Sequence, residues 1–400
     1  MEFGDSPQEA AFRSALRDWL AVSNPGLPAF STSDQYWAEA AAWHQSLYDA
    51  GFFGLSWPRE YGGQGLPAVY DVILDTELSA AGAPARPSLG YLVRGFLQHG
   101  SDDVKRRFLP GIISGQDRWC QGFSEPEAGS DLAALRTIAE RDGDQWIITG
   151  HKIWTSYSDS ADWCLLLART DASVPRHKGL TAFAVPMDQP GIRQRPIKMI
   201  NGVSREFGEV AFDHAIARHQ DMIGSPGDGW KLAMTVVSHE REPSELGYVA
   251  RYTKAASDMA QLVARDRDRF TSQDIDAVGW ALVQAEMLRV HTCRRLSERQ
   301  GGISPGPAGS VDKLLMTETD QAVGRAALGL STLGIGLPGP AASGTEDPGD
   351  PGGDPAGGPP VSGDSWLRMY LYSRAASVMG GTSQIQLNLV ATRVLELPVA

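Results

Sequence analysis

A turn-rich segment in the middle of the chain holds residues suited to bind a flat ring. Residues 124–131 read SEPEAGSD, in which Pro126 and Gly129 place main-chain N–H groups in a loop rather than in a sheet. Residues 145–154 alternate and are rich in β-branched and aromatic side chains, which predicts a strand. The serine hydroxyls of this region, beside Trp154, suit a ring with polar edges such as a flavin, although serines and aromatics in a sheet are more often turn and core residues.

The elements that must position this segment fall into three regions. Residues 1–117 predict a helical domain, residues 118–226 a β-sheet domain, and residues 227–400 a helical bundle. Within the last region, residues 338–364 are so rich in Gly, Pro and Asp that we expect a disordered loop. The predicted strands are residues 145–154, 162–169, 180–185 and 208–212. The fold class predicted from this order is α+β.

Local signals refine the helices. Ser6 is a suitable N-cap for the first helix, with Pro7 at its first position. Residues 231–264 carry helical periodicity, which Pro243 must kink or interrupt. The dense Gly, Pro and aromatic content of residues 51–65 predicts a packed structural loop. Further helices are predicted at residues 275–296, 312–333 and 366–395, the last of them interrupted near residues 380 and 381.

Composition and charge restrict the partners and the compartment. The 400-residue chain has a net charge of −12, which gives no electrostatic reason to expect nucleic-acid or anionic-membrane binding. Cys120, Cys164 and Cys293 are odd in number and far apart, so they predict neither disulfides nor a metal site and favour a reducing cytoplasm. The N-terminus lacks a basic segment followed by an apolar one, and no run of ~18 apolar residues predicts a membrane span.

Two segments match known signatures by letter but lack the required context. Residues 334–339 read GIGLPG, but they follow a helical pattern rather than a strand, so they do not predict a dinucleotide-binding fold. Residues 239–243 read HEREP, in which Pro243 stands where a second zinc ligand would be needed. Neither segment therefore predicts the site that its letters suggest.

Two segments of the sheet region resemble the acyl-CoA dehydrogenase family. SEPEAGSD at 124–131 is similar to that family's (S/T)EPxAGSD segment, and KIWTS at 152–156 is similar to its KxW(I/T)(T/S) segment. The resemblance implies that the first segment contacts non-covalently bound FAD and a thioester ligand, and that the second stacks Trp154 near the flavin. The residues that the resemblance assigns to FAD here are Gln121, Phe123, Ser124, Gly129, Ser130, Trp154 and Ser156. Ser130 is also assigned to the thioester substrate.

The resemblance extends over nearly the whole chain. WPREYGGQG at 57–65 is similar to a loop that precedes the family's acyl-pocket helices, and MIGSPGDGW at 222–230 is similar to the passage that leads into its C-terminal bundle. The resemblance therefore implies a helical domain, a β-sheet domain and a C-terminal four-helix bundle. An anionic CoA thioester remains compatible with the acidic chain, because it needs only a local basic site.

The catalytic base departs from the commonest family pattern. GGTSQIQ at 380–386 resembles the signature EGTxxIQ, but Gly380 stands where many members carry the catalytic glutamate. A subset of the family, including the isovaleryl and long-chain types, places the base on an earlier helix directly before an arginine, and Glu240-Arg241 falls at that place. Desaturation of a thioester needs a carboxylate that reaches the α-proton, and we expect burial to raise the pKa of that carboxylate.

Several alternatives remain open around this base. Glu240 lies in the charged run HERE and could instead be a solvated surface residue, in which case Glu242 and Glu245 are the other candidates. Arg241 could bind the CoA side of the substrate or simply pair with a carboxylate. The Gly380 N–H could bind the thioester oxygen, where enolate charge develops.

The second half of the flavin site is only partly retained. RDRF at 267–270 matches a family RxxF element that reaches the flavin across a subunit interface. STLGIG at 331–336 aligns with the family's QxxGGxG loop, but Ser331 and Ile335 stand where a Gln and a Gly are usual. The residues that the resemblance assigns to this half are Arg267, Phe270, Gly334, Thr382 and Gln384. We therefore expect a tetramer, either of identical chains or with a related chain that supplies the missing contacts.

The resemblance implies an FAD-dependent acyl-CoA dehydrogenase that produces a 2,3-enoyl-CoA and passes electrons to an electron-transfer flavoprotein. A bulky acyl group, such as a steroid side chain, is a secondary expectation, because bacterial dehydrogenases for such substrates resemble a heteromeric arrangement. Two alternatives remain, namely a non-catalytic partner subunit of a heteromeric dehydrogenase and an oxygen-using oxidase or hydroxylase of the same fold.

Overall fold

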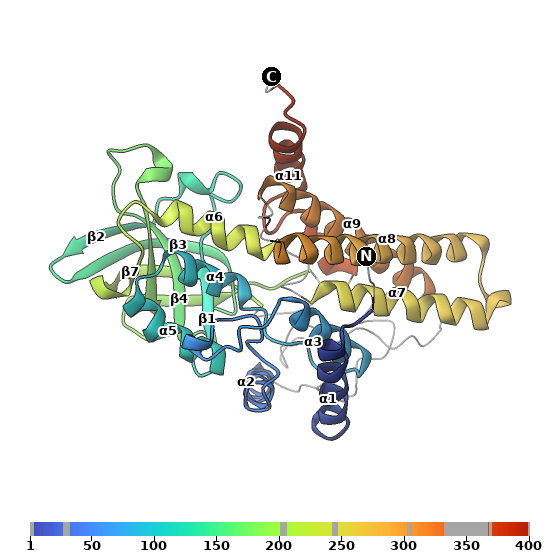
Figure 1. Ribbon diagram of the computed structural model, residues 1–400. Helices are drawn as coiled ribbons and strands as arrows, with labels where there is room; N and C mark the ends of the chain where they lie inside the picture. Colours follow the sequence, from blue (N-terminus) through green and yellow to red (C-terminus); the bar gives the residue numbers. More distant parts are fainter. Residues whose placement is uncertain are drawn as a thin grey trace.

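The computed structural model describes most of the chain as a β-sheet region between two helical regions (Figure 1). The described residues are 4–26, 33–200, 206–241, 247–301, 303, 306–331, 367 and 370–398. The sheet lies at one end of the molecule, and the long helices of the C-terminal half lie at the other. The predicted α+β architecture is confirmed. The expected disordered stretch at 338–364, and also Pro243, Gly334 and Ile335, lie outside the described residues.

The N-terminal region is helical, as predicted. Its helices are α1 (Pro7–Ser23), α2 (Ser33–Asp49), α3 (Val69–Ala80), α4 (Gly90–His99) and α5 (Asp102–Ser114). Ser6 caps α1 by accepting from the Glu9 N–H, and the Glu9 carboxylate accepts from the Ser6 N–H, which completes a capping box. Sequence and structure therefore agree on where the first helix begins.

The loop between α2 and α3 is a packed structural element, as its sequence predicts. Leu55, Trp57 and Tyr61 are buried in the N-terminal core. A Cβ placed on Gly63 would lie 2.2 Å from the Trp57 carbonyl oxygen, so the two parts of this loop can approach each other only with glycine at 63. The loop thereby joins α2 to the remainder of the domain.

Across the described residues, eight strands form one sheet in the order β6-β7-β3-β2-β4-β5-β8, with β1 paired to β4. The strands are β1 (Trp119–Gly122), β2 (Ile138–Asp142), β3 (Gln145–Ser156), β4 (Trp163–Arg169), β5 (Leu180–Pro186), β6 (Ile192–Pro196), β7 (Phe207–Arg218) and β8 (Met222–Ile223). The four predicted strands are β3, β4, β5 and β7. The other four are short, and a short strand carries little periodic signal in the sequence.

The centre of the sheet is buried on both faces. Leu165 and Leu167 of β4 pack against the N-terminal helices, whereas Cys164 and Leu166 face a second core with Trp146. This two-sided burial explains why β4 and β5 are continuous apolar runs rather than alternating ones. The sheet is therefore a rigid base for the loops at its edges.

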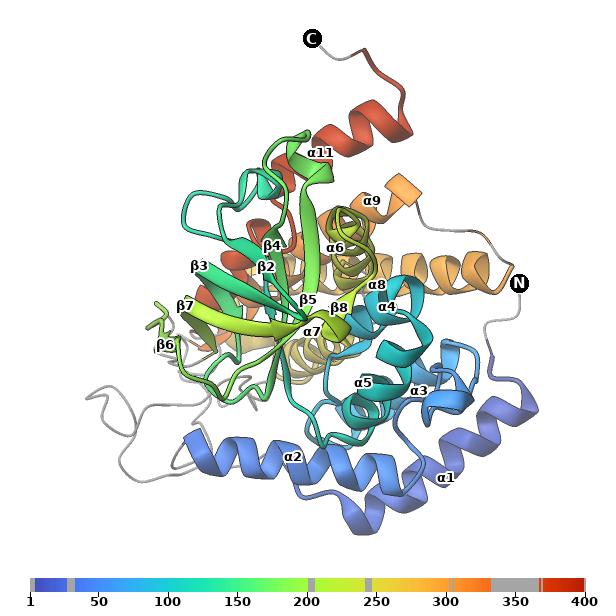
Figure 2. The same ribbon diagram turned by 90° about the vertical axis from the view of Figure 1, so that its left-hand side faces the viewer.

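The C-terminal region is helical, as predicted. Its helices are α6 (Gly229–Glu240), α7 (Tyr248–Arg265), α8 (Ser272–Gln300), α9 (Gly309–Ser331) and α11 (Ser383–Leu389). Helices α7, α8 and α9 share a core that includes Met259, Leu288 and Val323. Helix α6 instead packs between α4 of the N-terminal region and β5 of the sheet (Figure 2). The last residue of α6 therefore lies where the three regions meet. None of the described helices is both long enough and apolar enough to cross a bilayer.

The predicted final helix at 366–395 is interrupted near residues 380 and 381, as expected, and is also broken before them. A 3-10 turn at Ala375–Ser377 and the left-handed residues Gly380 and Gly381, with φ of 64° and 90°, separate the segment near 370 from α11. A π-helical turn at Val390–Val394 follows α11. Left-handed backbone cannot continue a right-handed helix, so the interruption predicted near residues 380 and 381 breaks the helix completely.

Candidate active site

A buried lysine joins the two segments that the sequence assigns to a flavin. Lys152 on β3 is fully buried, and its Nζ donates to the Phe123 carbonyl at 3.0 Å and to Glu125 Oε1 at 2.9 Å. Glu125 also accepts from the main-chain N–H groups of Arg136 at 2.7 Å and Thr137 at 2.8 Å. These contacts fix the turn-rich loop relative to β3.

The Lys152–Glu125 pair is charged at neutral pH. Burial lowers the pKa of Lys152 to about 8, and Glu125 acts against that shift. Burial acts to raise the pKa of Glu125, but Lys152, Thr137 and Arg136 together bring it below its ordinary value. The pair is therefore a buried salt bridge whose further hydrogen bonds satisfy the carboxylate.

Trp154 leaves the buried face of β3 through a β-bulge. Alternation along β3 buries Trp146, Ile148 and Lys152, so a regular strand would bury Trp154 as well. Instead, Trp154 has a φ of 60°, and the pairing with β7 shifts between Lys152 and Thr155. The indole is consequently 56% exposed. Bulges of this kind redirect side chains next to functional sites.

The surface beside Trp154 is open to a ligand. Gly129 and Ser130 are exposed, and a Cβ placed on Gly129 would meet no atom within 4 Å. Ser124 and Ser156 are partly buried. Phe123 differs from these residues, because its ring is part of the hydrophobic core. The structure thus gathers the predicted loop residues at one surface but leaves the Phe123 ring out of it.

Glu240 is the last residue of α6 and lies beside β1 and α4. Burial raises the pKa of its carboxyl, whereas Arg241, Lys313 and a hydrogen bond from Gln121 lower it. Burial, and then the Glu240 carboxylate, raise the pKa of the Tyr91 phenol. A partly buried carboxylate with a raised pKa, surrounded by donors and cations, has the properties of a general base.

The backbone turn at residues 380 and 381 lies against Arg241. The Arg241 Nε donates to the Gly380 carbonyl at 2.8 Å. A Cβ on Gly381 would lie 2.8 Å from Arg241 Nη2 and 2.6 Å from Gln386 Nε2, so only glycine fits there. The structure therefore brings Gly380 to Glu240 and Arg241, although Gly380 follows Glu240 by 140 positions in the sequence. Gln121 joins these residues to the loop side of the site.

Two residues of the second flavin half, Arg267 and Phe270, lie away from this site within one chain. Helix α7 begins at Tyr248, which neighbours Glu240, and has 18 residues, so its far end lies about 27 Å away. Arg267 follows that far end and is exposed, whereas Phe270 is buried in the core of α7–α9. Gly334 lies outside the described residues.

The two remaining predicted residues lie on α11. The Thr382 side chain caps this helix by accepting from the Ile385 N–H at 3.2 Å, and Gln384 is exposed. Helix α11 projects from the body of the molecule (Figure 1). Thr382 directly follows the turn beside Arg241, so it is close in the chain to the Glu240 cluster, while Gln384 faces solvent.

Three residues of the site were not predicted from the sequence, namely Lys152, Lys313 and Tyr91. Lys152 has the same parity on β3 as Trp146 and Ile148, so the period-two pattern could have indicated a buried lysine. No comparable signal marks Lys313 or Tyr91, because helices that are distant in the sequence bring them to Glu240.

Another buried carboxyl, Glu206, predicts a pH-dependent stability. Burial raises its pKa to about 7 from an ordinary value of 4.5, although Tyr372, whose hydroxyl donates at 2.7 Å, and Arg251 act to lower it. The folded state therefore binds more protons than the unfolded state between these values, and the stability falls by roughly 3 kcal/mol as the pH rises through this window. We expect Glu206→Gln to remove this fall, as measured by melting temperature between pH 4.5 and 7.5.

The exposed Glu140 is the matched control for Glu206. Glu140→Gln should keep the wild-type pH dependence, because an exposed carboxylate contributes little to the difference between the two states. A Glu206→Gln protein whose melting temperature still falls across the same window would contradict the assignment.

All three regions of the chain match one family. The acyl-CoA dehydrogenase N-terminal domain matches residues 6–116, the middle domain residues 120–215, and the C-terminal domain residues 227–395. The chain therefore belongs to the acyl-CoA dehydrogenase family. It is an acyl-CoA dehydrogenase, an oxidoreductase that acts on a CH–CH group.

Relatives and solved structures agree with this family. The acyl-CoA dehydrogenase IpdE1 of Mycobacterium tuberculosis is 37% identical over 399 residues, which cover 97% of each chain. IpdE1 of Mycolicibacterium smegmatis is 35% identical, again over 97% of each chain. The Tcur3481-Tcur3483 steroid acyl-CoA dehydrogenase superposes with a TM-score of 0.82 at 25% identity over all of both chains. A chain of the ChsE4-ChsE5 complex from Mycobacterium tuberculosis gives 0.79 at 26% identity, also over all of both chains.

Proposed function

We propose that this chain catalyses the FAD-dependent α,β-dehydrogenation of an acyl-CoA thioester to the 2,3-enoyl-CoA, with Glu240 as the base. The observation that carries the proposal is the position of Glu240 between Gln121 of β1 and Arg241 at the Gly380 turn. By family analogy, the electrons pass to an electron-transfer flavoprotein. An intact base at this place favours a catalytic chain over a non-catalytic partner subunit.

The proton and the electron pair leave the substrate by different routes. The Glu240 carboxylate takes the α-proton, and the C–H electrons form the new double bond as the β-hydrogen departs with its pair. Bound FAD would accept this β-hydrogen as hydride. The Gly380 N–H is proposed to stabilise the thioester oxygen, where negative charge develops as the α-proton leaves.

The loop surface of the sheet fits a flavin. Two buried polar atoms there, Gln121 Oε1 and Thr155 Oγ1, have no hydrogen-bond partner among the described residues. The exposed indole of Trp154 and the open main chain at Gly129 lie on adjoining segments. We assign FAD to this surface. The residues proposed to hold it lie on β1, on the loop and on β3, namely Gln121, Ser124, Gly129, Ser130, Trp154 and Ser156.

The visible spectrum of the purified protein tests the proposed function. We expect bound flavin absorbance that bleaches anaerobically when a panel of acyl-CoA thioesters is added, and recovers with an electron-transfer flavoprotein. A protein that cannot be reconstituted with FAD, alone or with a related chain, would overturn the proposal. Rapid recovery with oxygen alone would favour an oxidase or hydroxylase instead.

Gly129 offers a test of the FAD surface that is free of packing effects. Its φ is not in the left-handed region and a Cβ would meet open space, so Gly129→Ala should leave the melting temperature of the FAD-free protein unchanged. We expect FAD affinity to fall by about tenfold or more, equal to about 1.4 kcal/mol, because the added methyl group occupies the space of the ligand. The measurement is FAD titration by fluorescence.

Gly279 on α8 is the matched control for this substitution, because a Cβ there also meets no neighbour. Gly279→Ala should stabilise the helix by up to about 1 kcal/mol and leave FAD affinity unchanged. Equal FAD affinity of the Gly129→Ala and wild-type proteins would remove Gly129 from the proposed surface.

A bulky acyl group is the substrate class that we propose. One superposed structure is titled a steroid acyl-CoA dehydrogenase, and its agreement with this chain extends over both full lengths. The acyl-CoA panel should therefore include steroid side-chain thioesters beside linear ones. Faster bleaching with linear medium-chain thioesters would contradict this substrate class without affecting the proposed reaction.

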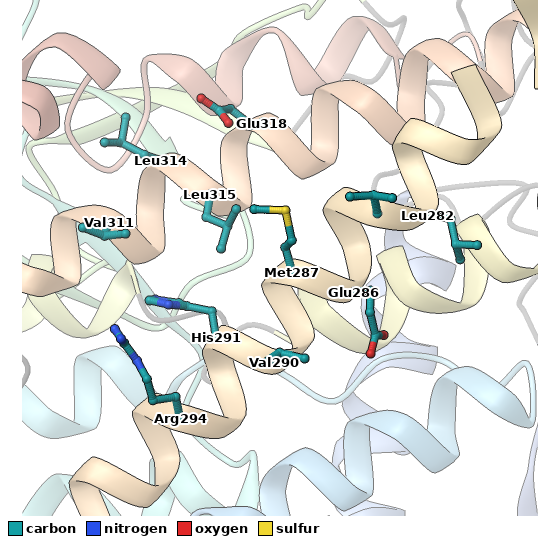
Figure 3. Close-up of a pocket in the computed structure, with 11 residues that line it drawn as sticks. Leu282, Glu286, Met287, Val290, His291, Arg294, Val311, Leu314, Leu315 and Glu318 are labelled. Carbon is teal, nitrogen blue, oxygen red and sulfur yellow. The ribbon is translucent and has the colours of Figure 1, made fainter. Parts of the chain in front are cut away.

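We further propose that the working assembly is a tetramer, in which a neighbouring chain supplies the second flavin half. Arg267 lies about 27 Å along α7 from the Glu240 end of its own chain, which supports contact with a flavin on another subunit. The names of two superposed structures pair different chains, which supports a heteromeric form. Among the described residues, a largely apolar groove between α8 and α9 offers a contact surface (Figure 3).

Met287 lies near the middle of this groove, whose exposed apolar side chains also include Leu282, Val283 and Val290. An apolar patch of this kind marks a protein interface. We expect Met287→Asp to dissociate the assembly, as measured by molecular mass, since it would place a charge in an apolar contact. Gln261→Asp, on an exposed position of α7, is the control and should keep the wild-type mass.

Mass measurement combined with flavin quantitation distinguishes the two forms of the tetramer. A flavin-poor oligomer of this chain alone, which gains FAD when a related chain is added, would support the heteromeric form. A stable homotetramer with one FAD per subunit and acyl-CoA turnover would rule out an obligate partner.

A further inference from the structure

A buried lysine from α9, Lys313, acts electrostatically on Glu240 and contacts the segment before the Gly380 turn. Its Nζ donates to Thr317 Oγ1 at 3.1 Å and to the carbonyl oxygen of Ala376. A Cβ placed on Gly380 would lie 3.5 Å from Lys313 Cε, so the lysine stem touches the turn that presents Gly380. Lys313 thus connects α9 to the backbone segment 375–380 from inside the protein.

The charges around Glu240 come from several elements. Arg241 directly follows Glu240 as the C-cap of α6, and its Nε donates to the Gly380 carbonyl. The other titratable or polar groups that act on Glu240 or are acted on by it are Gln121 of β1, Tyr91 of α4, Tyr248 of α7 and Lys313 of α9. Lys313 and Arg241 are the two cations of this set, so they oppose the effect of burial on the carboxylate.

Lys313 itself is charged at neutral pH, although burial makes its protonated form less stable. Burial lowers its pKa to about 8, Arg241 acts in the same direction, and Glu240 and Asp320 act against the shift. An ammonium group removed from water is strongly disfavoured unless an opposite charge and hydrogen bonds compensate. The hydrogen bonds to Thr317 and Ala376 satisfy two of its three donors, and Glu240 and Asp320 supply the opposite charge.

We propose that Lys313 is a positioning residue for the dehydrogenation: it stabilises the ionised Glu240 carboxylate and holds the Gly380 turn against α9. The inference rests on the proposed role of Glu240 as the base. The carboxylate must be ionised before it can take a proton, and the turn must be in place for the Gly380 N–H to face the thioester oxygen. One side chain serves both requirements because its charge acts on the Glu240 carboxylate while its stem and ammonium group contact the segment that presents Gly380.

The first test is the pH profile of flavin reduction by acyl-CoA in a single turnover. Lys313→Met keeps the length and apolar stem but removes the charge. We expect Lys313→Met to shift the acid limb of the profile to higher pH by about one unit. At a given pH on that limb the rate should therefore fall about tenfold. At high pH the rates of the variant and wild-type proteins should become equal. Lys313→Arg should restore the limb. Lys254→Met, which removes an exposed lysine that pairs with Asp258 on α7, should not move it.

The second test titrates the Glu240 carboxyl directly by infrared spectroscopy, with Glu240→Gln identifying its signal. This readout needs no turnover, so it separates the two proposals. A Lys313→Met protein with an unshifted Glu240 titration overturns the role of Lys313, whatever the activity. A rate loss that is equal at all pH values, without rescue by Lys313→Arg, also overturns it. If the Glu240 titration shifts in Lys313→Met but no acyl-CoA reduces the bound flavin, the interaction of Lys313 with Glu240 is supported and the proposed function is refuted.

Discussion

Replacing Glu240 with glutamine is expected to lower the rate of flavin reduction by acyl-CoA by about 10²–10⁴-fold, the usual contribution of a general base. Glutamine has the same shape as glutamate and can keep the hydrogen bond with Gln121, but it cannot take the α-proton. FAD binding should be unchanged, because the residues proposed to hold it lie on the sheet. The measurement is anaerobic stopped-flow reduction of the bound flavin.

The control for this experiment is Glu39→Gln, which neutralises an exposed carboxylate on α2 and should leave the rate unchanged. Wild-type reduction in the Glu240→Gln protein would reject Glu240 as the base. The same substitution at Glu242 and Glu245 would then show whether either neighbouring carboxylate acts instead.

The second large effect concerns the buried Lys152–Glu125 pair. Lys152→Met should lower the free energy of unfolding by about 3–5 kcal/mol, the usual effect of removing one partner of a buried salt bridge. The substitution leaves Glu125 buried with its main-chain donors but without a counter-charge. It also frees the Phe123 carbonyl, which Lys152 contacts at 3.0 Å. Urea-induced unfolding followed by tryptophan fluorescence measures the change.

Lys231→Met is the matched control for Lys152→Met, because Lys231 forms an exposed ion pair with Asp228 at 2.8 Å. Exposed pairs contribute about 0–1 kcal/mol, so this variant should unfold near the wild-type urea concentration. Adding Glu125→Gln to Lys152→Met should recover part of the stability, since it removes the unpaired charge. Equal stability of the Lys152→Met and Lys231→Met proteins would contradict the proposed contribution of the buried pair.

Part of this fold could be predicted from local sequence because the relevant forces are local. Ser6, Pro7 and Glu9 together specify the start of α1 through a capping box within four residues. The continuous apolar runs of β4 and β5 indicated buried strands without knowledge of their neighbours. The interruption of the final helix could also be predicted, because the two adjacent glycines at 380 and 381 are local signals for left-handed backbone.

The sequence predicted only those residues of the candidate site that belong to a recognisable motif. The segments at 124–131 and 152–156 identified the loop surface by resemblance, but regular alternation along β3 would give no reason for an exposed Trp154. The bulge between Lys152 and Thr155 depends on pairing with β7, which begins more than fifty residues later. A bulge is a property of two strands in register, so one strand's sequence does not determine it.

The amino-acid sequence alone determined the family, the order of the three regions and the identity of Glu240 as a candidate base. The tertiary structure decided what surrounds that carboxylate. Several of its neighbours are distant from Glu240 in the sequence: Tyr91 comes from α4, Gln121 from β1, Lys313 from α9, and the Gly380 turn from the segment before α11. Burial and charge at a carboxylate depend on distances in space, so its pKa, and with it the ability to act as a base, is fixed only when these elements pack together.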